Sequence, residues 1–213
     1  MAEFLLELYS EEIPHGLQIN AREEIKRNLL KSLEEESIKY RSSEVYSTPT
    51  RLTLLVRDLS TEISIEAKEV RGPKVGISEN IIEGFMKSHQ ITRKDLFEKI
   101  EEKGNFYYFK KESKKILTEY VLSKLIPKVI ESVNWKKSMR WSDHDLMWGR
   151  PLRSILAIFN NKHLKFNYHH LTSFDGVIIV ENFIDKIKKI KNFKEYELQL
   201  KKNKIYLKQE DRK

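Results

Sequence analysis

The chain has 213 residues, a formal net charge of +8 and 34% charged residues, which is typical of a globular protein with a heavily charged surface. It contains no Cys, which excludes disulfide bonds and thiolate metal sites. No apolar run approaches the ~20 residues of a membrane-spanning helix, and the N-terminus lacks a basic leader segment, so we expect a cytoplasmic protein.

The first 70 residues predict a β-α-β-β unit. Glu3–Tyr9 reads as an apolar strand, and a helix is expected to begin just after Ser10, whose hydroxyl can cap its first turn. Two strands follow, separated at Thr48-Pro49. Apolar residues recur every fourth position in the helix and every second position in the last strand: Leu17, Ala21, Ile25, Leu29 and Leu33, then Leu52, Leu54 and Val56.

Residues 71–185 predict a second α+β unit, and a Gly/Pro loop over 69–76 places the boundary near residue 70. Its expected elements follow in chain order: a short helix over 78–90 with Ser78 as its cap, a charged helix or loop over 93–103, a turn at Gly104-Asn105, a strand over 106–111, a helix over 116–133 kinked near Pro127, a strand pair over 153–168 with a turn at Asn160-Asn161, and a strand over 176–183.

Residues 186–213 predict a basic helical tail. They contain eleven Lys or Arg against four acids, and Ile184, Ile187 and Ile190 have helical spacing. Such a charged segment is typical of a solvated face and also suits a polyanion such as nucleic acid. The predicted fold class is α+β, with mixed or antiparallel sheets and packed helices in one or two subdomains.

The sequence contains no motif for a self-sufficient active site. Phosphate-loop, dinucleotide-binding and nucleophile-elbow patterns are absent. The neighbouring His169 and His170 would point to opposite faces of a strand, which prevents them from sharing a metal. Asp143-His144-Asp145 lacks the spacing of a metal motif and reads as a polar turn. We therefore expect no catalytic and no metal-binding residue in this chain.

A cation-rich and ring-rich stretch, "KKSMRWSDHDLMWGRPLR", covers Lys136–Arg153. Its Arg side chains are forked, permanent cations that suit phosphate. Trp135, Trp141 and Trp148 can stack on bases. The alternative is that the Trp side chains are core anchors and that the Arg side chains pair with acids. Composition favours this alternative, and the pattern by itself indicates a basic α+β domain that can bind RNA.

The order of the motifs resembles the N-terminal region of the bacterial glycyl-tRNA synthetase β subunit. The matching elements, in order, are FLLELYSEEIP at 4–14, Thr48-Pro49-Thr50-Arg51-Leu52, Arg71-Gly72-Pro73, Gly84-Phe85 with Ser88, Lys137 with Met139-Arg140-Trp141, and Arg150-Pro151. Thr50 and Ser142 stand where the family usually has Arg and Gly. A Gly-His-Arg-Phe element of the family is not matched at 176–183, apart from the region of Gly176 and Phe183.

This resemblance implies a role within an assembly of α and β subunits, a heterotetramer. In the family the α subunit holds the class II catalytic core, uses ATP with Mg²⁺ to form glycyl-adenylate, and transfers glycine to tRNA. The β subunit binds tRNA and is needed for a working enzyme. The expected partners of this chain are therefore the α subunit and tRNA-Gly, with no cofactor in the chain itself and no membrane or DNA partner.

Family members are longer and continue into a helical HD-like region and an anticodon-binding region, so the resemblance implies an expressed fragment or the product of a shortened or split gene. Three roles follow for it: tRNA contact with subunit assembly, a structural module that docks on the α subunit, or a remnant without function. The residues expected to contact tRNA are Arg51, Arg71, Lys74, Lys136, Lys137, Arg140, Trp141, Arg150 and Arg153.

Overall fold

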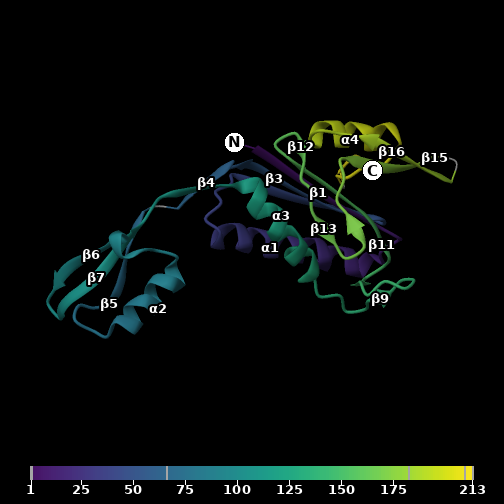
Figure 1. The fold of residues 1–213 in the computed structure, drawn as a ribbon. Helices are drawn as coiled ribbons and strands as arrows, with labels where there is room; N and C mark the ends of the chain where they lie inside the picture. The colour runs from purple at the N-terminus through teal and green to yellow at the C-terminus, as the bar shows by residue number, and fades with distance from the viewer. Residues whose placement is uncertain (1, 66, 182, 209, 213) are drawn as a thin grey trace. The chain divides into compact units, whose positions relative to one another are not determined.

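Five strands that all pair antiparallel form the central sheet (Figure 1). The computed structural model describes residues 2–65, 67–181, 183–208 and 210–212. The strand order is β12 (Lys162–His163), β11 (Leu152–Phe159), β1 (Ala2–Ser10), β3 (Arg51–Leu59) and β2 (Ser42–Thr48). Strand β1 is central, and its Leu6 lies opposite Ala157 on one side and Leu54 on the other. The α+β fold class predicted from the sequence is confirmed.

The chain divides into two units. Unit 1 comprises Met1–Ile63 and Leu117–Lys213, and unit 2 comprises Ser64–Ile116. This division differs from the predicted boundaries at 70 and 185. The reason is that strands distant in the sequence pair in one sheet, so residues after 117 belong with the N-terminal residues.

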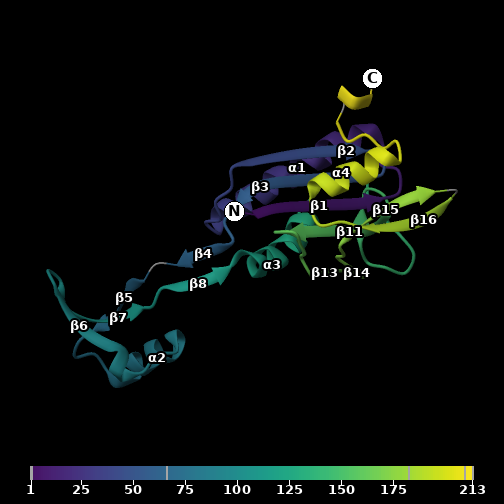
Figure 2. The ribbon, with the colours of Figure 1, turned by 90° about the horizontal axis from the view of Figure 1, so that it is seen from above.

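Both faces of the central sheet are covered (Figures 1 and 2). Helices α1 (His15–Glu35) and α3 (Thr118–Glu131) pack on one face, where they meet Leu6 and Leu54. Strand β15 (Gly176–Glu181) and helix α4 (Phe193–Lys202) supply the apolar cluster on the other face, which includes Leu5 and Leu55. The alternation in β3 therefore predicts one buried face correctly, but the opposite face is buried as well.

The predicted helices of unit 1 are present, with two differences. Helix α1 begins at His15, after Pro14, and Ser10 stays in strand β1, where its hydroxyl donates to the Glu11 carbonyl oxygen. The predicted Ser10 cap is therefore wrong. Helix α3 continues through Pro127, because the apolar face around it, including Ile126 and Ile130, is fully buried against the sheet.

The described residues of unit 2 form a three-stranded antiparallel sheet of order β5-β7-β6 and one α-helix. The elements are β5 (Lys68–Lys74), α2 (Glu79–His89), the short 3-10 helix η1 (Arg93–Asp95), β6 (Leu96–Glu101) and β7 (Gly104–Lys111). The chain enters and leaves the unit through the paired strands β4 (Glu62–Ile65) and β8 (Lys114–Leu117).

The prediction was wrong for two segments of unit 2. The expected loop over 69–76 is largely strand β5, in which Gly72-Pro73 lies at a register shift between Arg71 and Lys74. Such an irregularity accommodates a Pro within a strand. The charged segment after η1 is strand β6, and the chain reverses at Glu102-Lys103 before Gly104, whose φ is +118°.

The C-terminal segment was also predicted wrongly in part. Ile184–Lys189 is strand β16, which pairs with β15 over its whole length, and it is not helical. Helix α4 and the short 3-10 helix η2 (Glu210–Arg212) follow. Two further hairpins are β9 (Met139–Arg140) with β10 (Met147–Trp148), and β13 (Asn167–Tyr168) with β14 (Leu171–Thr172). None of the described helices is long and apolar enough to cross a membrane.

A polar network lies inside the apolar cluster under α4. Arg51 Nε is 3.0 Å from Glu7 Oε2, and the two side chains are only 4% and 1% exposed. The Tyr196 hydroxyl of α4 donates to Glu7, and Thr53 Oγ1 lies 2.9 Å from that hydroxyl. Burial raises the pKa of Glu7, and the Arg51 guanidinium and the Tyr196 hydroxyl act against this rise.

This network stabilises the layer that covers the second face of the sheet. Besides pairing with Glu7, Arg51 donates to the backbone carbonyl oxygen of Ile178 in β15. Two neighbouring strands, a helix and a hairpin thus meet at one ion pair. The guanidinium is enclosed by the protein, so the prediction that Arg51 contacts tRNA does not fit this structure.

We expect Arg51→Met to reduce the free energy of unfolding by about 3–5 kcal/mol, because Glu7 then remains buried without its partner charge. Chemical denaturation measures this loss. The matched control is Arg41→Met, which removes an exposed pair with Asp58 at 3.5 Å and should cost at most about 1 kcal/mol. Adding Glu7→Gln to Arg51→Met should recover part of the loss. An Arg51→Met variant as stable as the control would contradict the assignment.

Candidate nucleic-acid interface

Two of the three Trp side chains anchor the segment that follows α3. Trp148 is buried, and its ring centroid lies 4.8 Å from that of Trp135 in an edge-to-face arrangement. Gly149 lets the Trp135 ring lie against the backbone, since a Cβ at that position would come within 2.2 Å of Trp135 Cε3. The core-anchor alternative therefore holds for Trp135 and Trp148.

The third ring lies on the exposed hairpin β9–β10. Trp141 directly follows β9 and is 62% exposed. Arg140 is opposite Met147 in the hairpin and lies 3.8 Å from Asp145 Oδ1. Both partners of this ion pair are largely exposed, so the pair is weak and the guanidinium can exchange Asp145 for another anion.

Two lysines adjoin this hairpin. Lys136 and Lys137 are exposed, and neither has an ion-pair partner among the residues that the structure describes. With Arg140 and Trp141 they place three cations and one free ring within six residues of the chain. We call these four residues the hairpin cluster.

Arg150 and Arg153 differ from the hairpin cluster. Arg150 is half-buried and donates to the Gly149 carbonyl oxygen at 3.0 Å. Arg153 forms an ion pair with Asp185 of β16, lies 3.6 Å from Glu11 Oε1, and covers the Tyr9 ring at 5.4 Å. Arg153 thus links strand β11 to the β15–β16 hairpin, and its charge is largely compensated.

The remaining candidates, Arg71 and Lys74, belong to unit 2. Arg71 Nη1 is 3.2 Å from Glu101 Oε2, and its guanidinium lies 3.7 Å from the centroid of the Phe106 ring. Lys74 is exposed. The nine predicted residues therefore fall into three environments. Arg51 is buried, Arg71 and Lys74 lie on the unit 2 sheet, and the other six lie between residues 136 and 153 of unit 1 with differing exposure.

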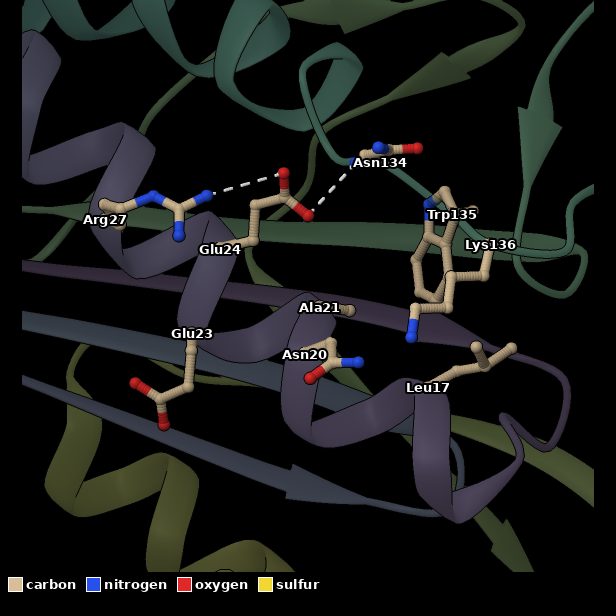
Figure 3. A pocket seen from close by; sticks show the side chains of 9 residues that line it. All are labelled: Leu17, Asn20, Ala21, Glu23, Glu24, Arg27, Asn134, Trp135 and Lys136. Carbon is tan, nitrogen blue, oxygen red and sulfur yellow. Dashed lines mark hydrogen bonds and ion pairs between the residues drawn. The ribbon is translucent and has the colours of Figure 1, made fainter.

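A pocket of about 320 Å³ adjoins the hairpin cluster (Figure 3). Its walls are helix α1 and the segment around Trp135, and its lining residues are Leu17, Asn20, Ala21, Glu23, Glu24, Arg27, Asn134, Trp135 and Lys136. Glu24 accepts the Asn134 N–H at 3.2 Å and lies 3.6 Å from Arg27, which fixes this segment on α1. The sequence did not predict this pocket, because more than a hundred positions separate its two walls.

Two His side chains hold the loop of the hairpin. The rings of His144 and His170 stack with centroids 3.6 Å apart and planes 8° from parallel. His170 lies in the turn between β13 and β14, so the prediction that it belongs to a strand is wrong. Neighbouring His169 lies 3.3 Å from Glu131 Oε2. Across the described ranges, no three His, Cys, Asp or Glu side chains are grouped to hold a metal ion.

The His stack is predicted to open as the pH falls. Burial lowers the pKa of His170 below its usual 6.5, with further lowering by His144 and His169. The stacked conformation thus binds fewer protons than the open one, and its stability is full above about pH 6.5 and declines below it. Amide NMR shifts of residues 141–146 should move on acidification. They should move less in His170→Phe, and equal titration of both proteins would contradict this.

Comparison with known proteins places the chain among aminoacyl-tRNA synthetase subunits. Residues 4–213 match the family described as glycyl-tRNA synthetase beta subunit, and the chain belongs to this family. The resemblance seen in the ordered sequence motifs is thereby confirmed.

The curated relatives are glycine–tRNA ligase beta subunits. The protein of Rickettsia canadensis is 33% identical over 208 residues, and that of Rickettsia akari is 34% identical over 208 residues; each alignment covers 97% of this chain and 31% of the relative. The protein of Rickettsia prowazekii is 36% identical over 173 residues, which are 81% of this chain and 26% of the relative. The chain therefore spans about a third of the length of these relatives.

Proposed function

We propose that this chain is the N-terminal part of a glycine–tRNA ligase β subunit and that it contributes contacts to tRNA-Gly. The observation that supports the proposal is the hairpin cluster, in which Lys136, Lys137 and Arg140 accompany the exposed ring of Trp141. The chemistry is assigned to a partner α subunit, which would use ATP with Mg²⁺ to charge the tRNA. This chain would bind and orient the RNA.

Two features of this segment suit it to bind RNA: its cations are weakly paired, and the chain that carries them is held in place. The Trp135–Trp148 contact anchors the ends of the segment, while the hairpin carries cations that are weakly paired at most. When such cations contact the phosphates of RNA, the counterions condensed on those phosphates are released, and this release favours binding. An exposed indole adds a surface on which an unpaired base can stack.

We expect Arg140→Ala to weaken binding of tRNA-Gly roughly 10-fold at low salt, since a hydrogen bond to a charged group contributes about 1.5 kcal/mol. The slope of log affinity against log salt should also decrease by ~0.7–0.9, the contribution of one phosphate contact. Titration of labelled tRNA at several salt concentrations measures both quantities.

The matched control for this experiment is Arg41→Ala, which removes one exposed Arg of unit 1 outside the hairpin and should leave both quantities nearly unchanged. Equal losses of tRNA affinity in the Arg140→Ala and Arg41→Ala variants would mean that the effect comes from the net charge of the chain and not from a contact of Arg140. Affinity of the unmodified chain that is absent, or that does not depend on salt, would sink the proposal of phosphate contact.

A second role, docking on the α subunit, is favoured by the β15–β16 hairpin. Phe183 at its turn is 102% exposed, and Val180, Ile184 and Ile187 on its strands are each more than half exposed. A group of four exposed apolar side chains on one hairpin is typical of a protein interaction surface. In Figure 2 this hairpin extends beyond the edge of the central sheet.

We expect Phe183→Asn to weaken association with a separately produced α subunit about 10-fold or more, because burial of one large apolar side chain contributes ~1.5–3 kcal/mol. Asn suits this position, where φ is +62°. Sedimentation of the mixture measures the complex. Leu198→Asn on α4 is the matched control, because Leu198 is also about half exposed. Unchanged association of the Phe183→Asn variant would exclude the hairpin as the docking element.

A further inference from the structure

The sheet of unit 2 has two faces with different roles. Helix α2 packs on one face through Phe85, whose ring lies 5.8 Å from that of Phe109. Gly72 of β5 allows this approach, because a Cβ there would come within 2.8 Å of Phe85 Cε1. Phe109 and its neighbours across the strands, Val70 and Leu96, therefore belong to the face that α2 covers (Figure 1).

The opposite face carries three aromatic rings. Tyr108 and Phe106 alternate with the residues that face α2, and Phe97 lies directly opposite Tyr108. The rings of Phe97 and Tyr108 are stacked, with centroids 6.1 Å apart and planes 29° from parallel. Phe97 is 39% exposed and Phe106 is half-buried, so part of this aromatic surface meets solvent.

Cations lie over two of these rings, Phe106 and Tyr108. The Arg71 guanidinium is 3.7 Å from the centroid of Phe106, and Lys99 Nζ is 5.5 Å from that of Tyr108. Their ion pairs with Glu101 at 3.2 Å and Glu69 at 2.8 Å are exposed and hence weak.

Two further lysines increase the positive charge of this face. The strand register places Lys74 opposite Phe106 and Lys110 opposite Glu69. Neither forms an ion pair with any residue in the described part of the chain. Four cations therefore accompany two carboxylates around the three rings, which we call the aromatic face of unit 2.

We propose that the aromatic face of unit 2 binds a short single-stranded segment of RNA. Unpaired bases would stack on Phe97 and Phe106, and their phosphates would contact Arg71, Lys74 and Lys110. A sheet that displays rings between cations suits this ligand, because every base has a flat face and every nucleotide a phosphate. A duplex hides its base faces and gives the rings nothing to stack on.

This inference rests on the proposed function in one respect, which is that the single-stranded RNA segment belongs to a tRNA. It assigns the binding to different residues from those of the hairpin cluster. Arg71 and Lys74 were candidates from the sequence, whereas the rings were not, since they alternate with core residues on two different strands.

The test uses the full chain, with a labelled 10-nucleotide oligouridine as probe and an RNA duplex of the same length for comparison. We expect Phe97→Leu and Phe106→Leu each to weaken binding of the single strand about fivefold or more, with the affinity for the duplex unchanged. The matched control is Ile100→Ala, because Ile100 is also on β6, is 82% exposed and alternates to the other face. It should bind as the unmodified chain does.

Single-strand binding by the Phe97→Leu and Phe106→Leu variants at the level of the Ile100→Ala control would overturn the inference, as would equal affinity of the unmodified chain for strand and duplex. If Phe97→Leu weakens association with the α subunit while RNA binding persists, the face is a protein-docking surface and the inference fails.

Arg140→Ala, measured with tRNA in parallel, separates the two proposals. Dependence of tRNA binding on Arg140 without dependence of oligouridine binding on Phe97 would leave the proposed function in place and overturn this inference. Dependence of oligouridine binding on Phe97 supports this inference whatever the Arg140 result.

Discussion

The ion pair between Glu7 and Arg51 is the constraint on which unit 1 depends most. Both charges are removed from water, so each requires the other in a fixed position. The pair sits between the central strands β1 and β3. The residues that complete it are Tyr196 of α4, 189 positions from Glu7, and Ile178 of β15, 127 positions from Arg51. Helix α4 and strand β15 must therefore pack on this face of the sheet so that the Tyr196 hydroxyl reaches Glu7 and the Ile178 carbonyl oxygen reaches Arg51.

The same constraint bears on the surfaces proposed for function. Strand β15 is fixed by Arg51 at Ile178, and its partner β16 is held to β11 through Arg153 and Asp185. Both strands that lead to the exposed apolar turn of this hairpin are thus attached to the central sheet. On the cation-bearing hairpin, the Trp135–Trp148 contact and the His144–His170 stack have the corresponding role. In both places, contacts at the base of a hairpin position exposed side chains that are available to a partner.

Local patterns predicted much of the fold. The four-residue spacing from Ala21 to Leu33 predicted α1, and the apolar run at Phe4–Leu8 predicted β1, because these periods reflect burial on adjacent elements. The spacing of Ile184, Ile187 and Ile190 suggested a helix, but Ile184–Lys189 forms a strand because it pairs with β15. The Gly-Pro pair at 72–73 suggested a loop, whereas the strand accommodates it at an irregularity.

The candidate site was predictable in part. The ordered motifs identified the family, and the Met-Arg-Trp element led to the exposed hairpin. Burial of Arg51 could not be predicted, since its partner Glu7 lies in a different motif and a guanidinium is usually exposed. The same limit applies to the three Trp residues, of which two are anchors and one is free. The aromatic face of unit 2 could not be predicted either, because the register of strands β6 and β7 places its rings side by side.

We propose that the exposed hairpin meets tRNA while the sheet that supports it stays in place. Hydrogen–deuterium exchange of the chain with and without saturating tRNA-Gly tests this directly. We expect slower exchange of the backbone amides in residues 136–147 when tRNA is present, with unchanged exchange in the buried strands β1 and β3. Protection elsewhere in unit 1 with no change across 136–147 would contradict it.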